Sequence, residues 1–156
     1  MFLTIHSTAA IAITQSITNP MGAFFIGLIS HYILDFIPHG DEKFKNYSIS
    51  EMAKMAIVDH FGILIIVITI FLFKPDFSFT ANIIFGVIGA LLPDWLTAIH
   101  RLSTKSQNLM IKKMRNFITP LQSFHCYIHR LIKYRISFPT GIVLQTIFLI
   151  IFWWLI

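Results

Sequence analysis

Long apolar runs limit what this chain can fold into more than any other feature of its sequence. Residues 62–73 read GILIIVITIFLF, twelve residues without a charge, and similar runs occur before and after them. Of the 156 residues, 56% are hydrophobic and 12% are charged, whereas soluble domains carry roughly a quarter of charged residues. The mean hydropathy is +0.74. The composition therefore predicts an integral membrane protein.

The apolar runs predict an all-α fold, a polytopic bundle of about four to five membrane helices in one domain over residues 1–156. Asn19-Pro20 marks a helix start, and Ser48 or Ser50 is placed to cap a later helix. Gly86 and Gly89 are expected to let neighbouring helices approach closely. Helices are predicted over residues 3–18, 20–37, 51–73, 79–93 and 138–156, the fourth ending at Pro93.

Residues 101–135 differ from the rest because they are strongly basic. They hold eight of the twelve Lys and Arg residues, and apolar residues such as Met114 and Phe117 alternate with the charges. We predict an amphipathic helical segment in the cytoplasmic membrane interface, divided at Pro120, with anionic lipid headgroups as partners. Nucleic acid is not an expected partner, because no recognisable binding module surrounds these charges.

A second feature is a group of possible metal ligands at the end of the helix predicted over residues 20–37. His31 and Asp35 are four residues apart, so a helix places them on one face. Pro38 disfavours helical geometry at the preceding residue, so His39 follows the helix end and can fold back towards Asp35. Asp41 is a weaker candidate, since an acidic residue after Gly40 is ordinary in a loop.

Other helices bring further polar residues to the same end of the bundle. Consecutive membrane helices alternate in direction, which places His6, Asp59, His60 and Asp94 on the side of His31 and Asp35. That side also carries eleven of the twelve Lys and Arg residues. By the positive-inside rule, the polar cluster is predicted to face the cytoplasm.

Histidine and aspartate in an apolar setting predict a divalent metal centre. Cys126 is the only cysteine, so no thiolate site is expected, and zinc fits best with manganese or iron as alternatives. One or two ions are compatible with this many ligands. His60 is the candidate general acid or base, or it orients a ligand. The predicted ligands are His6, His31, Asp35, His39, Asp59 and Asp94.

Three histidines remain outside this predicted ligand set. His100, His125 and His129 are expected mainly at the membrane interface. His125 and His129 nevertheless share a helical face, which leaves a contribution to the metal centre open.

The motifs resemble a family of small bacterial membrane-bound metal-dependent hydrolases, which includes the LexA-regulated inner-membrane hydrolases and is remotely similar to zinc-dependent phospholipases C. The likeness covers residues 4–100. It implies hydrolase activity and a location in the bacterial inner membrane. Members carry a second acid two residues after Pro-Asp, where this chain has Leu96. The matching residues are His6, His31-x3-Asp35, Pro38-His39, Asp59-His60 and Leu92-Pro93-Asp94.

Three functions are compatible with the sequence. The first is hydrolysis of a phosphoester or lipid-type substrate at the cytoplasmic membrane face by metal-activated water. The second is a non-catalytic metal carrier or sensor, which would need polar groups continuing across the bilayer. The third is a membrane scaffold that recruits a partner through its basic segment.

Overall fold

The described part of the chain consists of six helices joined by short connections, and no strand occurs within it. The computed structural model describes residues 1–40, 48–131 and 134–156. The helices are α1 (Leu3–Thr14), α2 (Pro20–Asp35), α3 (Ile49–Phe73), α4 (Ala81–Ser103), α5 (Leu109–Leu131) and α6 (Phe138–Leu155). The predicted all-α class is confirmed.

Three of these helices, α3, α4 and α6, are long and apolar enough to cross a membrane. The other two apolar helices, α1 and α2, have 12 and 16 residues, so α2 measures about 24 Å at 1.5 Å per residue. The five apolar helices agree with the predicted bundle. Large apolar side chains at the end of α3, including Phe71, Leu72 and Phe73, are more than half exposed, as expected for a surface in contact with lipid.

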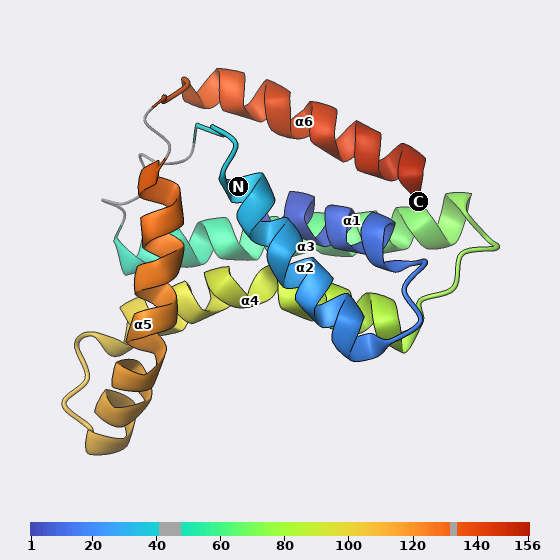
Figure 1. Cartoon of the computed structure of the whole chain (residues 1–156). Helices are drawn as coiled ribbons and strands as arrows, with labels where there is room; N and C mark the ends of the chain where they lie inside the picture. Colours follow the sequence, from blue (N-terminus) through green and yellow to red (C-terminus); the bar gives the residue numbers. More distant parts are fainter. Residues whose placement is uncertain (41–47, 132–133) are drawn as a thin grey trace.

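Helix α1 lies in the middle of the bundle, where it contacts α2, α3, α4 and α6 (Figure 1). Ten of its twelve residues are buried. The helix is rich in small residues such as Ala9 and Ala10, both fully buried. Its short side chains allow four neighbours to surround it, and they place His6 in the interior.

Glycines bring α2 and α4 into close contact. A Cβ atom on Gly27 would lie 2.0 Å from the carbonyl oxygen of Gly86, and one on Gly89 would lie 2.1 Å from that of Phe24. The prediction that Gly86 and Gly89 permit close helix approach is therefore confirmed. The two backbones are in direct contact at these positions, as in other membrane helix pairs, so a larger residue cannot fit there.

The helix starts agree with the sequence, whereas two predicted breaks at proline were wrong. Asn19 caps α2 with Pro20 at its first position, and Ser48 forms a capping box with Glu51 at the start of α3. However, α4 continues through Pro93 to Ser103, and α5 continues through Pro120. Neighbouring helices pack against both elements, and in membrane helices such packing compensates for the hydrogen bond that proline removes. Asp94 is consequently within a helix.

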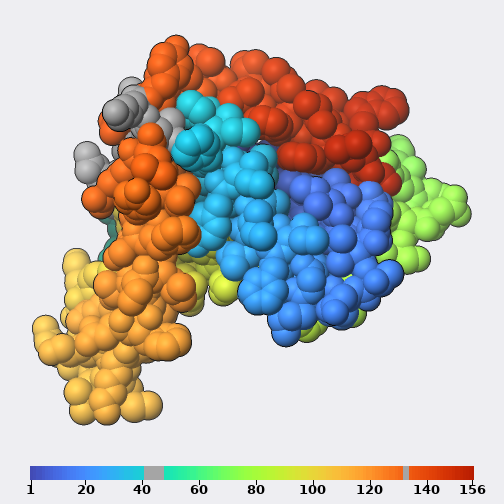
Figure 2. Space-filling model, in the orientation of Figure 1, coloured from blue at the N-terminus to red at the C-terminus, as the bar shows by residue number. Residues whose placement is uncertain are grey.

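Helix α5 crosses the end of the bundle at a steep angle to the other helices (Figure 1). It packs against α4 and α2, and its first half and the preceding turn project from the body (Figure 2). The projecting half carries Lys112, Lys113 and Arg115 together with the exposed Met110 and Phe117.

Candidate metal centre

The carboxylate of Asp35 is the centre of a buried polar cluster. Its side chain is completely buried. The Nε2 atoms of His31, His125 and His129 lie 3.1, 3.0 and 2.9 Å from its Oδ2 atom. We call these four residues the Asp35 cluster.

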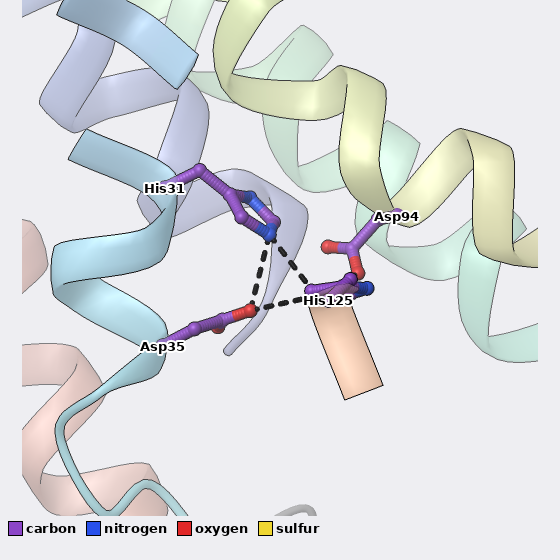
Figure 3. A group of neighbouring side chains, drawn as sticks. All are labelled: His31, Asp35, Asp94 and His125. Atoms are coloured by element: carbon purple, nitrogen blue, oxygen red, sulfur yellow. Dashed lines mark hydrogen bonds and ion pairs between the residues drawn. The ribbon is translucent and has the colours of Figure 1, made fainter. Parts of the chain in front are cut away.

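Helix α2 supplies His31 and Asp35 from adjacent turns, so both side chains leave the helix on the same face (Figure 3). The Nδ1–H group of His31 donates to the carbonyl oxygen of Ala90 in α4 at 2.7 Å. The close contact of α2 and α4 makes this hydrogen bond possible. It directs Nε2 of His31 towards Asp35, as expected for a histidine whose second nitrogen binds a metal.

Helix α5 supplies the other two histidines, four residues apart on one face. Nε2 of His125 lies 3.2 Å from Nε2 of His31 and 3.1 Å from Nε2 of His129. The second ring nitrogen of His125 contacts the hydroxyl of Thr97 in α4 at 3.0 Å. The site is thus assembled where α2, α4 and α5 meet.

The contacts within the Asp35 cluster are short, and a positive charge already lies beside it, because the N-terminal ammonium of Met1 donates to Asp35 Oδ1 at 2.9 Å. A carbonyl oxygen only accepts hydrogen bonds, so Nδ1 of His31 carries a proton and a neutral His31 presents a lone pair at Nε2. That lone pair faces Asp35 Oδ2 at 3.1 Å and His125 Nε2 at 3.2 Å. Protons on the neighbouring histidines can satisfy some of these contacts, and a divalent cation would satisfy all of them together. Two groups that share Asp35 could hold a metal ion: His31, Asp35, Asp94 and His125, and Asp35, His39 and His129.

Three further predicted ligands surround the Asp35 cluster. His6 of α1 donates from Nε2 towards Asp35 Oδ1 at 3.2 Å, and its ring stacks on His31 with centroids 4.1 Å apart. Asp94 Oδ1 lies 3.7 Å from His125 Nε2. His39 groups with Asp35 and His129, with ligand atoms within 4.8 Å of one another. The structure therefore brings His6, His31, Asp35, His39 and Asp94 together.

The loop position of His39 depends on α6. Nδ1 of His39 donates to the carbonyl oxygen of Ile37 at 2.6 Å. Gln145 of α6 donates to the carbonyl oxygen of His39 at 3.1 Å and accepts from the backbone N–H of Phe2 at 2.8 Å. Gly141 lets α6 approach, since a Cβ atom there would lie 2.0 Å from the His39 carbonyl oxygen. The last helix thus supports the centre without supplying a ligand.

Asp59 is placed differently from the other predicted ligands. Its two carboxylate oxygens accept from the backbone N–H groups of Leu3 and Thr4 at 2.5 and 2.9 Å, and from the Thr4 hydroxyl. These N–H groups have no partner within α1, because the first turn of a helix leaves them open. Asp59 thus caps α1 from the side of α3, and its role as a metal ligand stays a prediction.

His60 lies on α3 beside a cavity of about 350 Å³ that adjoins the Asp35 cluster. Nδ1 of His60 donates to the Ala56 carbonyl oxygen at 2.6 Å, so Nε2 is the acceptor for the indole N–H of Trp95 at 3.4 Å. The cavity wall also includes Asp59, Asp94, His125 and His129. The catalytic role of His60 stays a prediction, with an accessible location in its favour.

His125 and His129 are the residues to which sequence reasoning assigned no definite role. Their four-residue spacing resembles that of His31 and Asp35 and was the available signal. The ring of His100 contacts the hydroxyl of Thr119 at 3.2 Å, and among the described residues it is in neither group that could hold a metal ion. Asp41 lies outside the described residues.

Comparisons of the chain with family models, curated proteins and solved structures find no match. The resemblance to membrane-bound metal-dependent hydrolases therefore stays a prediction. What the structure itself establishes is a helical, membrane-type fold with a buried His and Asp group able to hold a metal ion.

Proposed function

We propose that this protein is an integral membrane hydrolase that uses a divalent metal ion, zinc in the first instance, to cleave phosphoesters at the cytoplasmic face of the bacterial inner membrane. One observation carries the proposal. Three imidazole Nε2 atoms lie 2.9–3.1 Å from one buried carboxylate oxygen. Ligands placed tetrahedrally at about 2.0–2.1 Å from zinc are roughly 3.3 Å apart, close to the 3.0–3.2 Å that separate Asp35 Oδ2 and the Nε2 atoms of His31 and His125.

The donor set also fits catalysis better than storage of the ion. Histidine and carboxylate ligands without thiolates are typical of zinc sites that keep a position open for water. When bound, such an ion lowers the pKa of that water to about 7 and polarises a phosphoryl oxygen. The adjoining cavity of about 350 Å³ provides space for a substrate group beside His125 and Asp94.

The residues of the chain then have separate tasks. His31, Asp35 and His125 are the proposed ligands, which would leave the fourth position of a tetrahedral ion for water, and His129 supports them through its contacts with Asp35 and His125. His6 and His39 hold the Asp35 carboxylate and the His129 ring from the second layer. His60, on the opposite wall of the cavity, is the proposed general acid or base. It would exchange protons through Nε2 after releasing the 3.4 Å hydrogen bond from Trp95. The basic first half of α5 is proposed to contact anionic headgroups.

Elemental analysis of detergent-purified protein tests the proposal first. We expect about one equivalent of zinc, manganese or iron in the wild type and almost none in a His125→Ala/His129→Ala variant. The metal-loaded wild type should hydrolyse bis-p-nitrophenyl phosphate or p-nitrophenyl phosphate, lose activity with a chelator and regain it on addition of the ion. Bound metal without hydrolysis of any phosphoester would support the carrier or sensor hypothesis, and absence of metal would support the scaffold.

A further inference from the structure

A large apolar groove runs between the first half of α3 and the last turns of α4. Its volume is about 580 Å³. On α3 its lining extends from Ile49 to Leu64, which spans about 22 Å at 1.5 Å per residue. The beginning of α3 and the end of α4 both lie near α5 in Figure 1. We refer to it as the α3–α4 groove.

The α3–α4 groove opens into the cavity beside the Asp35 cluster. Five residues line both spaces: Met52, Ala56, His60, Ala98 and Arg101. A molecule lying in the groove can therefore extend a polar end into the cavity without leaving the protein surface.

Arg101 supplies positive charge at this junction. Its guanidinium is half-buried and contacts the sulfur atom of Met52 at 2.9 Å. Among the residues that the structure describes, no carboxylate lies within ion-pair distance of it, and none lines the groove. A guanidinium without a carboxylate partner, at the boundary of apolar and polar space, is suited to bind a phosphate group.

A second groove, between α1, α3 and α6, has about 480 Å³ and provides a comparison. It also reaches the cavity, but of its two charged lining residues, Lys54 and Asp59, it is the carboxylate of Asp59 that also lines the cavity. A carboxylate at the opening repels phosphate. The charges therefore favour the α3–α4 groove.

We infer that the substrate is a lipid phosphoester whose acyl chain lies in the α3–α4 groove and whose phosphate group is bound by Arg101 at the edge of the metal cavity. This inference rests on the proposed hydrolase function and adds the substrate class. The chain would reach the site from within the bilayer, since the groove is formed by the membrane helices α3 and α4.

Native mass spectrometry of the detergent-purified, chelator-treated protein tests this inference without requiring catalysis. The probe is 1-oleoyl lysophosphatidate, compared with monoolein, which lacks the phosphate, and glycerol 3-phosphate, which lacks the chain. We expect lysophosphatidate to bind at least about tenfold more tightly than either. Equal binding of glycerol 3-phosphate, or of monoolein, would overturn the inference.

Variants separate the two parts of the binding site. Arg101→Gln should weaken lysophosphatidate binding about tenfold and leave monoolein unchanged, and Arg101→Lys should restore part of the loss. Ala53→Trp should fill the α3–α4 groove and weaken both lipids, whereas Val58→Trp, in the second groove, should weaken neither. Unchanged lysophosphatidate binding in Arg101→Gln, or equal losses in the two tryptophan variants, would contradict the inference. Circular dichroism identifies any variant that has not folded.

Hydrolysis of soluble phosphoesters by the metal-loaded wild type is measured in parallel. Lipid binding without this hydrolysis would refute the proposed function alone. Hydrolysis without selective binding of lysophosphatidate would refute the substrate assignment alone.

Discussion

Asp35 and Asp59 are both carboxylates in apolar helices, but the groups around them differ. Asp35 contacts groups that exchange protons, the imidazoles of His31, His125 and His129 and the N-terminal ammonium of Met1. Asp59 is surrounded by backbone N–H groups and a hydroxyl at the start of α1. Imidazoles can release protons and bind a cation instead, whereas amide groups cannot. A carboxylate buried in a membrane helix therefore needs hydrogen-bond donors around it. Imidazole donors are compatible with binding a cation, whereas backbone amide donors indicate a structural role.

The most severe test of this contrast is removal of the Asp35 carboxylate. We expect Asp35→Ala to lose the metal and to lower the free energy of unfolding by about 3–5 kcal/mol, because the variant leaves the buried ammonium of Met1, 2.9 Å from Asp35 Oδ1, without its counter-charge. Elemental analysis and thermal unfolding in detergent measure the two effects. Asp76→Ala, at an exposed carboxylate, is the matched control. Retention of the metal in Asp35→Ala would exclude Asp35 as a ligand.

A change at the contact of α2 and α4 should lower metal affinity at Asp35 and leave the hydrogen bonds of Asp59 unchanged. The Cβ atom of Gly89→Ala would lie 2.1 Å from the carbonyl oxygen of Phe24, so the helices must separate at a cost of about 1–3 kcal/mol. His31 then moves away from Ala90 and metal affinity falls. Gly22→Ala is the control, since its nearest neighbours would be 3.7 Å away. Equal metal affinity in both variants would contradict the proposed dependence.

A change at Asp59 is expected to lower stability without changing the metal content. Asp59→Asn replaces one acceptor oxygen at the start of α1, and we expect a loss of about 1–2 kcal/mol, as for a helix cap. Metal content should stay at the wild-type value, because every hydrogen bond that the structure assigns to this carboxylate is within α3 and α1. Elemental analysis checks this, and loss of the metal would return Asp59 to the ligand set.

The smallest effect is expected at Gln145, which contacts the neighbourhoods of both carboxylates. Gln145→Leu removes hydrogen bonds to the His39 carbonyl oxygen and the Phe2 N–H group, with an expected loss of about 1 kcal/mol in stability. Metal affinity should fall by no more than about tenfold, measured by competition with a coloured chelator. Thr146→Val, in the next position of α6, should change neither. A larger loss of affinity would mean that His39 binds the ion directly.

The sequence was sufficient to predict most helices and part of the centre. Apolar runs and the residues Asn19 and Ser48 mark helix starts through local chemistry, which does not depend on the rest of the fold. The four-residue spacing of His31 and Asp35 likewise determines their common face. The alternation of membrane helices was enough to bring His6 and Asp94 to the same end.

The remaining parts depend on contacts between helices that no local pattern specifies. The prolines at positions 93 and 120 lie within helices because neighbouring helices pack against them. The direction of α5 follows from its packing on α4 and α2, so the sequence alone did not show that His125 and His129 reach Asp35. The cap that Asp59 provides for α1 also arises only when the two helices dock.

The hydrogen bond from His31 to Ala90 has a consequence for how this protein can tolerate mutation. The acceptor is a main-chain carbonyl, and no side-chain replacement at position 90 removes it. Selection at that position consequently acts on the size and polarity of the side chain, since Ala90 has no exposed surface, and not on the acceptor itself. The backbone of α4 determines the orientation of the His31 ring, so exchange of Ala90 for another small residue would leave the ring in place.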